Sequence, residues 1–427
     1  MHGSLVGAVA QEDGAQFASF QYDPAFLPSR IEVAPIHVPL RAEAYRFPNL
    51  SRDSFHGLPG VLADSLPDKY GTTLVDAYLA GLGRSPGSAN AVERLCYTGR
   101  RGVGALEFEP ARGPGLSEST DDIQIAALVK LASEVLADRK ELDVSMAAGE
   151  EAQAMRDILR VGTSAGGARA KAVIAWNPET GVIRSGQAKA GPGFEHWLLK
   201  FDGVSENKDR EALADPQGYG AIEYAYSLMA RAAGIEMTEC RLLEENGRRH
   251  FMTKRFDRVG DEKVHMLSLG AMAHFDYTQA GAYAYEQAFM TMRELGLGTS
   301  AVEQQYRRAV FNIVARNQDD HVKNIAFLMD RSGRWSLSPA FDLAYSYNPS
   351  GEWTAHHQMS LNGKVDDFTL HDLRTGAERT MLKRSRGGQI LDEVREVVAD
   401  WPDYASQAGV LDHQVEAVQA GLWLSLR

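Results

Sequence analysis

Apolar residues recur at intervals of three and four over several stretches of the chain, which is the spacing of one face of an α-helix. The clearest stripes run through residues 123–136 and 306–314, and a third begins at Ala221 in the segment AIEYAYSLMARAAGI. Further helical patterns at 388–399 and 404–424 predict that the carboxy-terminal part of the chain is mostly helical.

Shorter apolar runs bounded by turn residues predict strands. Two such runs are HWLLKF at 196–201 and HFMTKRFDR at 250–258. The segments IAFLMD and WSLSPAFD, separated by a polar RSGR turn, predict a hairpin over 325–342. Near the amino terminus, two strands are expected on either side of an Asp13-Gly14 turn. Helices and strands together predict an α+β fold.

A stretch rich in glycine, proline and serine, ARGPGLSEST at 111–120, interrupts these patterns and is the best candidate for a linker. It separates a small amino-terminal α/β subdomain from a larger region. The predicted units are the amino-terminal subdomain (1–112), a linker and joining helix (113–150), and a larger region (151–427) with nucleotide-binding strands at 158–260 and a helical part at 261–427.

The composition is that of a globular protein with two or three domains, since 44% of the 427 residues are hydrophobic and 24% are charged. Cys96 and Cys240 are far apart and have no ligand-spaced partners, which disfavours a disulfide framework or a zinc site and favours the reducing cytoplasm. No apolar run approaches the roughly 20 residues that span a bilayer, so no membrane contact is expected. The net charge of −12 implies that any contact with DNA needs a basic partner.

The strongest chemical signal is NQDDHVKNIAFLMD, in which Asn324 follows Asp319 by five residues and Asp342 comes after the predicted hairpin. In protein kinases a catalytic aspartate is followed at this spacing by a magnesium-binding asparagine and then by a magnesium-binding aspartate. The order therefore predicts Asp319 as the general base and Asn324 and Asp342 as metal ligands. Taken singly, each carboxylate could serve turn formation instead. His321 is expected to orient the loop.

Two upstream features suit a nucleotide site. Lys200 ends a predicted strand, where a kinase lysine contacts phosphates, and Glu223 begins the next helix. Glu223 could pair with Lys200 or could simply favour the helix dipole. The segment at 161–176 contains Gly162, Gly166 and Gly167 before a predicted strand and could cradle phosphates through backbone N–H groups. Because Ala168-Arg169 replaces the Lys-Ser/Thr pair of a Walker A loop, a P-loop NTPase is disfavoured.

In their order along the chain, these motifs resemble those of the HipA family, serine/threonine kinase toxins of bacterial type II toxin–antitoxin modules. The resemblance covers nearly the whole chain and implies a two-lobed, protein-kinase-like region with a mostly helical carboxy-terminal lobe, which uses ATP and Mg²⁺. Leu343, not Phe-Gly, follows Asp342, and no His-Arg precedes Asp319, so regulation through a eukaryotic-type activation loop is not implied. The motifs are GLPGVLADSLPDKYG, TSAGGARAKA, HWLLKF, MTKRFDR, NQDDHVKNIAFLMD and LSPAFDLAYS.

The resemblance also implies roles for individual residues. Ser164 matches a loop serine that the kinase itself phosphorylates, and the backbone of residues 254–256 is expected to face adenine. The residues implied to bind the nucleotide are Gly166, Gly167, Ala168, Arg169, Ala170, Lys171, Lys200, Lys254, Arg255, Phe256, His321, Lys323, Asn324, Phe341 and Asp342.

The leading hypothesis is a magnesium-dependent protein kinase that acts as a toxin on a cytoplasmic protein. The resemblance implies that the target is an aminoacyl-tRNA synthetase or another translation component. It also implies a HipB-like helix-turn-helix antitoxin that links the chain to operator DNA. One alternative is a small-molecule or lipid kinase, because the Asp-x-His-x-x-Asn run at 319–324 also resembles lipid-kinase loops. Another is a nucleotide-binding corepressor scaffold with little catalysis.

Overall fold

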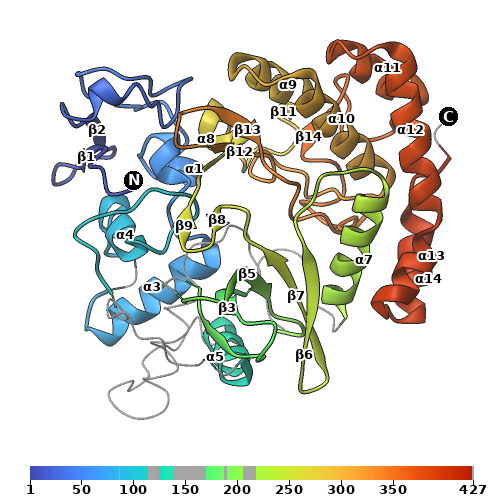
Figure 1. The fold of residues 1–427 in the computed structure, drawn as a ribbon, viewed down its shortest axis with the longest axis horizontal. Coiled ribbons are helices and arrows are strands. Elements are labelled where there is room, and N and C mark those ends of the chain that lie inside the picture. Colours follow the sequence, from blue (N-terminus) through green and yellow to red (C-terminus); the bar gives the residue numbers. More distant parts are fainter. Residues whose placement is uncertain are drawn as a thin grey trace.

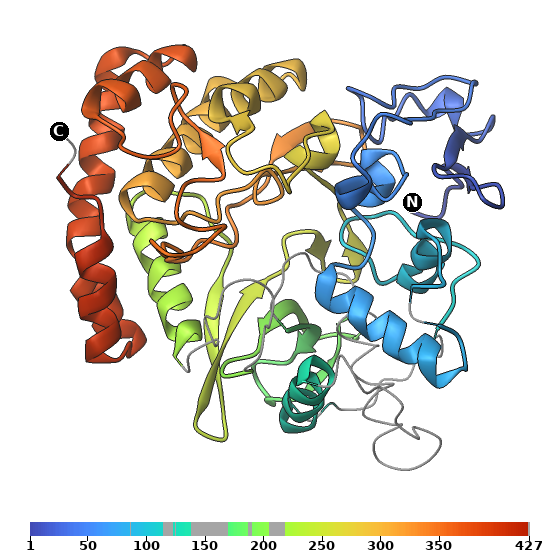
Figure 2. The same cartoon turned by 180° about the vertical axis from the view of Figure 1, so that it is seen from behind.

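The structure, a computed structural model, has three parts that lie side by side (Figures 1 and 2). An amino-terminal region, residues 1–112, lies along one side of the molecule, and the carboxy-terminal helices lie along the opposite side. The three parts are this amino-terminal region, a strand-rich lobe and a helical lobe, and the carboxy-terminal helices belong to the helical lobe. The structure describes residues 1–85, 87–113, 123, 125–137, 170–186, 190–204 and 218–425.

The amino-terminal region combines a small hairpin with short helices. β1 and β2 pair antiparallel, as predicted around the Asp13-Gly14 turn. The longest helix, α3, begins where the Asp68 side chain accepts a hydrogen bond of 2.6 Å from the Gly71 N–H, the usual chemistry of a helix N-cap. The elements are β1 (Gly7–Ala10), β2 (Ser19–Tyr22), the 3₁₀ helix η1 (Leu27–Ser29), α1 (Arg52–Phe55), α2 (Gly60–Ala63), α3 (Lys69–Gly81) and α4 (Ala91–Thr98).

The strand-rich lobe is a five-stranded antiparallel sheet in the order β4-β3-β5-β7-β6. Apolar residues of α3 and α5 share a core with residues of β3, β5 and β7, while α7 packs against β6 and β7. The elements are α5 (Ile125–Ala137), β3 (Lys171–Trp176), β4 (Ile183–Ser185), β5 (Glu195–Lys200), α7 (Tyr219–Ala232), β6 (Cys240–Glu245) and β7 (Arg248–Lys254).

The helical lobe contains the predicted hairpin, which is confirmed as β12 and β13, and β10 pairs with β12 as a third strand. Its elements are β8 (Arg258–Val259), β9 (Glu262–Lys263), β10 (His265–Ser268), α8 (Leu269–Ala273), β11 (Tyr283–Ala284), α9 (Tyr285–Glu294), α10 (Thr299–Val314), β12 (Ala326–Met329), β13 (Trp335–Leu337), β14 (Met359–Ser360), α11 (Leu370–Arg379), α12 (Arg384–Ala399), α13 (Trp401–Ala408) and α14 (Asp412–Gly421).

The prediction of one helix over 404–424 was wrong in one respect, because the chain breaks there into α13 and α14. Gly409 adopts a left-handed conformation with φ +66°, which ends α13 in the way that glycine commonly ends helices. The apolar positions continue across the break, so their periodicity alone did not reveal it. Among the described residues, none of the helices combines the length and apolar character needed to cross a membrane.

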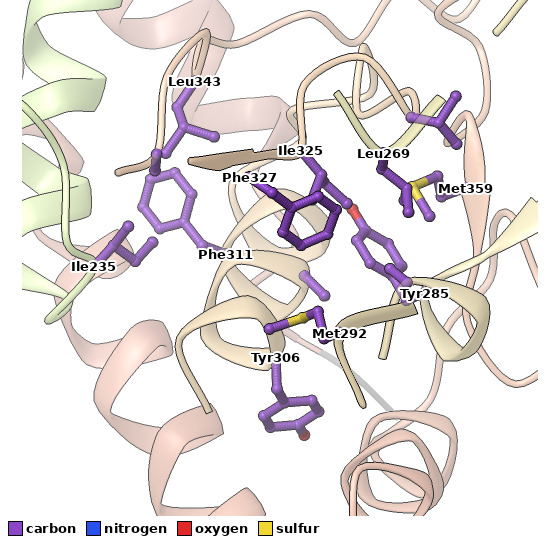
Figure 3. Close-up of a cluster of buried hydrophobic side chains, with 14 of the residues drawn as sticks. Ile235, Leu269, Tyr285, Met292, Tyr306, Phe311, Ile325, Phe327, Leu343 and Met359 are labelled. Atoms are coloured by element: carbon purple, nitrogen blue, oxygen red, sulfur yellow. The ribbon is translucent and has the colours of Figure 1, made fainter. Parts of the chain in front are cut away.

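The core of the helical lobe holds both ends of the segment between α10 and β12 (Figure 3). Tyr306 and Phe311 of α10 precede that segment in the chain, and Ile325 and Phe327 follow it. All four side chains are buried in one cluster. The mostly polar segment 317–324 therefore begins and ends on the same rigid hydrophobic support, as a preorganised site requires.

Two neighbouring glycines of α12 test how closely α12 packs against α11 in the helical lobe. A methyl group at Gly387 would collide with the Cβ of Ala377 in α11, so Gly387→Ala should lower the free energy of unfolding by about 1–3 kcal/mol. At Gly388 no described atom lies within 4 Å of an added methyl group, so Gly388→Ala should raise that free energy by about 0.5–1 kcal/mol. Urea unfolding of both variants measures the difference, and equal midpoints would contradict the close α11–α12 contact.

Candidate active site

Lys200 joins three separate parts of the chain. It ends β5, the third strand of the sheet in chain order, which is where protein kinases carry their phosphate-contacting lysine. Its Nζ donates a hydrogen bond of 2.5 Å to Oε1 of Glu223 in α7 and another to Oδ1 of Asp342. The side chains of Lys200 and Glu223 are only 13% and 2% exposed. Of the two alternatives for Glu223, the pair with Lys200 is therefore confirmed, and Glu223 lies outside the first turn of α7, the turn in which it would favour the helix dipole.

The charges within this group stabilise one another. Burial alone would raise the pKa of Asp342, but the Lys200 ammonium lowers it to about 2. Burial also opposes the charge on Lys200, yet Asp342 and Glu223 hold the pKa of Lys200 above its ordinary value. Asp342 has a left-handed backbone with φ +57°, a conformation that aspartate tolerates better than most residues. The local backbone thus places an ionised carboxylate beside Lys200.

Asp319 and Asp320 are neighbours in sequence but have different surroundings. The carboxylate of Asp320 is 1% exposed and accepts hydrogen bonds from the Tyr285 hydroxyl (2.6 Å) and the Gln358 N–H (2.8 Å), with His357 Nδ1 at 2.9 Å. Asp319 is 42% exposed. Asp320 is therefore an anchor within the protein, whereas Asp319 is the one that a ligand can reach.

The environment of Asp319 suits a proton acceptor. Burial by the surrounding protein raises the pKa of its carboxyl; His321, at 3.8 Å, opposes this effect, and the Asp342 carboxylate adds to it. The indole N–H of Trp353 donates a 2.9 Å hydrogen bond to Oδ1 and orients the group. A carboxylate with a raised pKa is a stronger base than an ordinary one.

A polar network fixes the backbone of this loop. The Ser346 hydroxyl oxygen accepts hydrogen bonds from the N–H groups of Gln318 (2.7 Å) and Asp319 (3.0 Å), and the hydroxyl donates to Oδ1 of Asn317 (3.2 Å). Asn317 in turn donates to Asn312 of α10 at 3.0 Å. The loop is thus tied both to its preceding helix and to the segment that follows Asp342.

Asn324 is oriented as a metal ligand would need to be. Its Nδ2 donates to the carbonyl oxygen of Asp319 at 2.8 Å, which assigns the amide nitrogen to the loop and leaves Oδ1 as an oxygen donor. Together with the Asp342 carboxylate it offers the oxygen ligands that Mg²⁺ prefers. The described residues hold no cluster of three or more His, Cys, Asp or Glu side chains suited to a metal. Magnesium in kinases needs no such cluster, because phosphate oxygens supply further ligands.

The segment expected to face adenine is partly committed to the protein itself. The N–H of Lys254 donates to the carbonyl of Glu239 (2.8 Å), and the N–H of Arg255 donates to the carbonyl of His196 (2.9 Å). The N–H of Phe256 has no partner within the described part of the chain. Of the three residues predicted to face adenine, Phe256 is the one whose backbone N–H is available to a nucleotide base.

Two further predicted residues lie against aromatic rings. The ring of Phe341 packs against Phe256, with centroids 5.5 Å apart, which brings the residue before Asp342 next to the end of β7. The Lys323 ammonium lies 4.3 Å from the centroid of the Tyr277 ring. Such a cation–π contact holds the lysine beside the loop that carries Asp319.

Lys171 is not free at the start of β3. Its Nζ lies 3.0 Å from Oδ2 of Asp68, and both side chains are buried. Ala170 lies in the core next to it, and its carbonyl accepts a hydrogen bond from the Phe201 N–H. The remaining predicted residues of this loop lie outside the described residues; they are Ser164, Gly166, Gly167, Ala168 and Arg169.

Four residues of the site were not predicted from the sequence. Asp68 and Ser346 lie within the motifs that resemble the HipA family, but nothing local in the sequence indicates their partners. The five-residue spacing to Asn324 favours Asp319 and gives no role to its neighbour Asp320. Trp353 lies 34 residues from Asp319, and no sequence spacing pointed to their contact.

The fold and the site define a two-lobed, kinase-like α+β protein. The family description "HipA-like C-terminal domain" matches residues 163–401, and "HipA N-terminal domain" matches residues 1–109. The chain belongs to the HipA family.

Two related sequences and one solved structure share less than 30% sequence identity with this chain over the matched residues. Two proteins of Sinorhizobium fredii (strain NBRC 101917 / NGR234), named "Putative kinase Y4dM" and "Putative kinase Y4mE", are 28% identical over 222 residues and 27% identical over 125 residues. These matches cover 47% and 27% of this chain but only 49% and 30% of the relatives. The HipA of a HipA, HipB and operator DNA complex from Shewanella oneidensis MR-1 aligns with a TM-score of 0.66. The aligned residues are 16% identical and cover 97% of this chain and 92% of the other. The two chains are therefore similar in fold.

The contrast between the adjacent aspartates can be tested by stability. Asp320→Asn should lower the free energy of unfolding by about 1–3 kcal/mol, because it disrupts a buried set of donors. Asp319→Asn should leave that free energy unchanged or raise it. A pKa raised by folding means that the ionised form at pH 7 opposes the folded state, and asparagine removes this cost. Urea unfolding at pH 7 compares the two, and greater damage from Asp319→Asn would reverse the assignment.

Proposed function

We propose that this chain is an ATP- and Mg²⁺-dependent protein kinase that transfers the γ-phosphoryl group to a serine or threonine hydroxyl. The observation that carries the proposal is the Lys200 bridge between Glu223 and Asp342, with an accessible Asp319 close by. Kinases use this set of groups to hold phosphates and metal and to orient the nucleophile. Membership of the HipA family and the names of the two relatives agree with it.

In this proposal each group has a separate task. Lys200 contacts the phosphates and stays oriented by Glu223. Asn324 and Asp342 would hold Mg²⁺, which when bound neutralises charge on the phosphate oxygens. Asp319 accepts the proton of the attacking hydroxyl. Trp353 keeps one oxygen of Asp319 in place, so the other is free for the substrate.

The proposed role is that of a toxin whose target is a cytoplasmic protein, such as an aminoacyl-tRNA synthetase or another translation component. The resemblance of the motifs to HipA kinases supports this choice. The alternative small-molecule or lipid kinase would use the same groups at 319–324, and a corepressor scaffold would use the nucleotide site without turnover. The products of one transfer reaction separate these three functions.

Asp319→Asn should lower phosphoryl transfer by a factor of about 10²–10⁴, the usual contribution of a general base. It should leave the affinity for MgATP nearly unchanged, because the Lys200 bridge is untouched. Radiolabelled ATP added to a lysate with the purified chain measures the transfer, and calorimetry measures the affinity.

The labelled product decides between the proposed functions. A labelled protein band supports the protein kinase, and a labelled small metabolite or lipid supports the alternative kinase. Wild-type turnover by Asp319→Asn would refute the choice of base. MgATP binding by the wild-type chain with no labelled product at all would favour the scaffold.

We also propose that Ser164 is phosphorylated by the chain itself and that this modification suppresses ATP binding. A phosphoserine adds roughly −1.5 to −2 charges, which the ATP phosphates would repel in a loop next to the nucleotide. Mass spectrometry should find phosphate on Ser164 in the active chain made without a partner, and none in Asp319→Asn. A phosphorylated form that binds MgATP as tightly as the unmodified chain would refute the switch and leave the kinase proposal intact.

The proposed partner is a basic, dimeric helix-turn-helix antitoxin. This antitoxin would link the chain to operator DNA. The net charge of −12 disfavours direct DNA binding by this chain and suits a basic partner. The similar HipA from Shewanella oneidensis MR-1 was solved with HipB and its operator DNA. Purification from the native cells should recover such a protein encoded next to this chain. Its absence from both the purified material and the adjacent genome would count against the proposal.

A further inference from the structure

The amino-terminal region contacts both lobes and the segment that connects them. On the strand-rich side, apolar residues of α3 lie in the same core as β3 and β5. On the helical side, Asp64 accepts hydrogen bonds of 2.8 Å from the N–H and the hydroxyl of Ser268. At the connection, the Gly104 N–H donates to Asp257 at 2.8 Å. This region is therefore positioned to act on the site between the lobes.

Two lysines of the sheet lie directly opposite each other. Lys171 of β3 pairs in register with Lys200 of β5, so their side chains leave the same face of the sheet. Each lysine has its own carboxylate partners. Lys200 contacts Glu223 and Asp342, whereas Lys171 contacts Asp68, with side-chain exposures of 3% for Lys171 and 7% for Asp68.

Asp68 is itself held rigidly. Its Oδ1 accepts the Gly71 N–H at the start of α3, and this leaves Oδ2 for Lys171. Because Asp68 belongs to the amino-terminal region, the region supplies a counter-ion to the strand-rich lobe. Lys171 also lies directly opposite Lys200, whose Nζ contacts Asp342, so its charge lies beside the site.

We propose that Asp68 is a positioning residue of the nucleotide site, which acts through Lys171 on the phosphate chain of a nucleoside triphosphate. The inference rests on the proposed kinase function. Buried like charges on one face of a sheet repel, so each requires its own counter-ion. Without the Asp68 charge, Lys171 would be repelled by Lys200 and would compete for its partners. The disturbance would reach the groups that hold the phosphates.

This mechanism distinguishes the phosphates from the rest of the nucleotide. The Asp68–Lys171 pair lies at the beginning of β3, beside Lys200, and makes no described contact with the Phe256 segment at the end of β7. A change in the pair should therefore weaken the binding of MgATP and leave the binding of adenosine unchanged. A general loosening of the fold would weaken both.

The test uses Asp68→Asn in the full-length chain, titrated calorimetrically with MgATP and with adenosine. Asparagine is as good an N-cap as aspartate, so this variant removes the charge and keeps the start of α3. We expect the affinity for MgATP to fall about tenfold, the scale on which partners that orient a ligand-binding group act. The affinity for adenosine should not change.

Glu107→Gln is the matched control. Glu107 also belongs to the amino-terminal region and forms an ion pair of 2.6 Å with a lysine beyond it, Lys263. That pair includes none of the groups of the nucleotide site, so both affinities should stay at their wild-type values. A tenfold loss of MgATP affinity in Glu107→Gln would assign the effect to the inter-region contact in general and overturn the role of Asp68.

Lys171→Met is a second variant for the same test, and it replaces Asp68→Asn if Asp68→Asn does not fold. It should weaken MgATP binding at least as much as Asp68→Asn, and the double variant should be no weaker than Lys171→Met, because the two residues act as one unit. Unchanged MgATP affinity in Lys171→Met or in folded Asp68→Asn, or an equal loss for adenosine, overturns the inference. Failure of the wild-type chain to bind MgATP refutes the kinase proposal and this inference with it.

Discussion

The whole site depends on one buried ammonium group. Lys200 is at the end of a central strand, and its charge is stabilised only because a helix supplies Glu223 and the segment after β13 supplies Asp342. Removing Lys200 would leave the buried Glu223 carboxylate without its counter-ion, and such an uncompensated buried charge costs far more than an ion pair stabilises. The sheet, α7 and the Asp342 segment must therefore stay in fixed positions relative to one another, and the rest of the site is arranged around that requirement.

The loop at residues 317–324 meets a second constraint, because it must be rigid and yet reachable. Its two ends lie on one hydrophobic core, and its middle is fixed by the Ser346 network and by Asp320. Hydrogen bonds of this kind restrict the loop to few conformations. Asp320 uses its carboxylate to hold the loop, whereas its neighbour Asp319 stays 42% exposed.

The sequence predicted what is encoded locally. Periodicity identified α7, α10 and the β12–β13 hairpin, and the five-residue spacing to Asn324 selected Asp319, the more exposed of the two aspartates. It left the Lys200–Glu223 pair as one of two possibilities, because a glutamate near the start of a predicted helix has a local explanation as well. The contact of Trp353 with Asp319 and that of Asp68 with Lys171 could not be predicted. These contacts depend on how distant segments pack, and no periodic pattern encodes that.

The amino-terminal region adds a constraint on motion. It is attached to the strand-rich lobe by the Asp68–Lys171 pair, and to the helical lobe by the hydrogen bonds between Asp64 and Ser268. It also contacts the connection between the lobes through Asp257. A hinge motion of the two lobes about that connection would have to break one of these contacts or carry the whole region with one lobe. Because the Asp68–Lys171 pair is buried, breaking it would separate two buried opposite charges, so the less costly motion separates the region from the helical lobe.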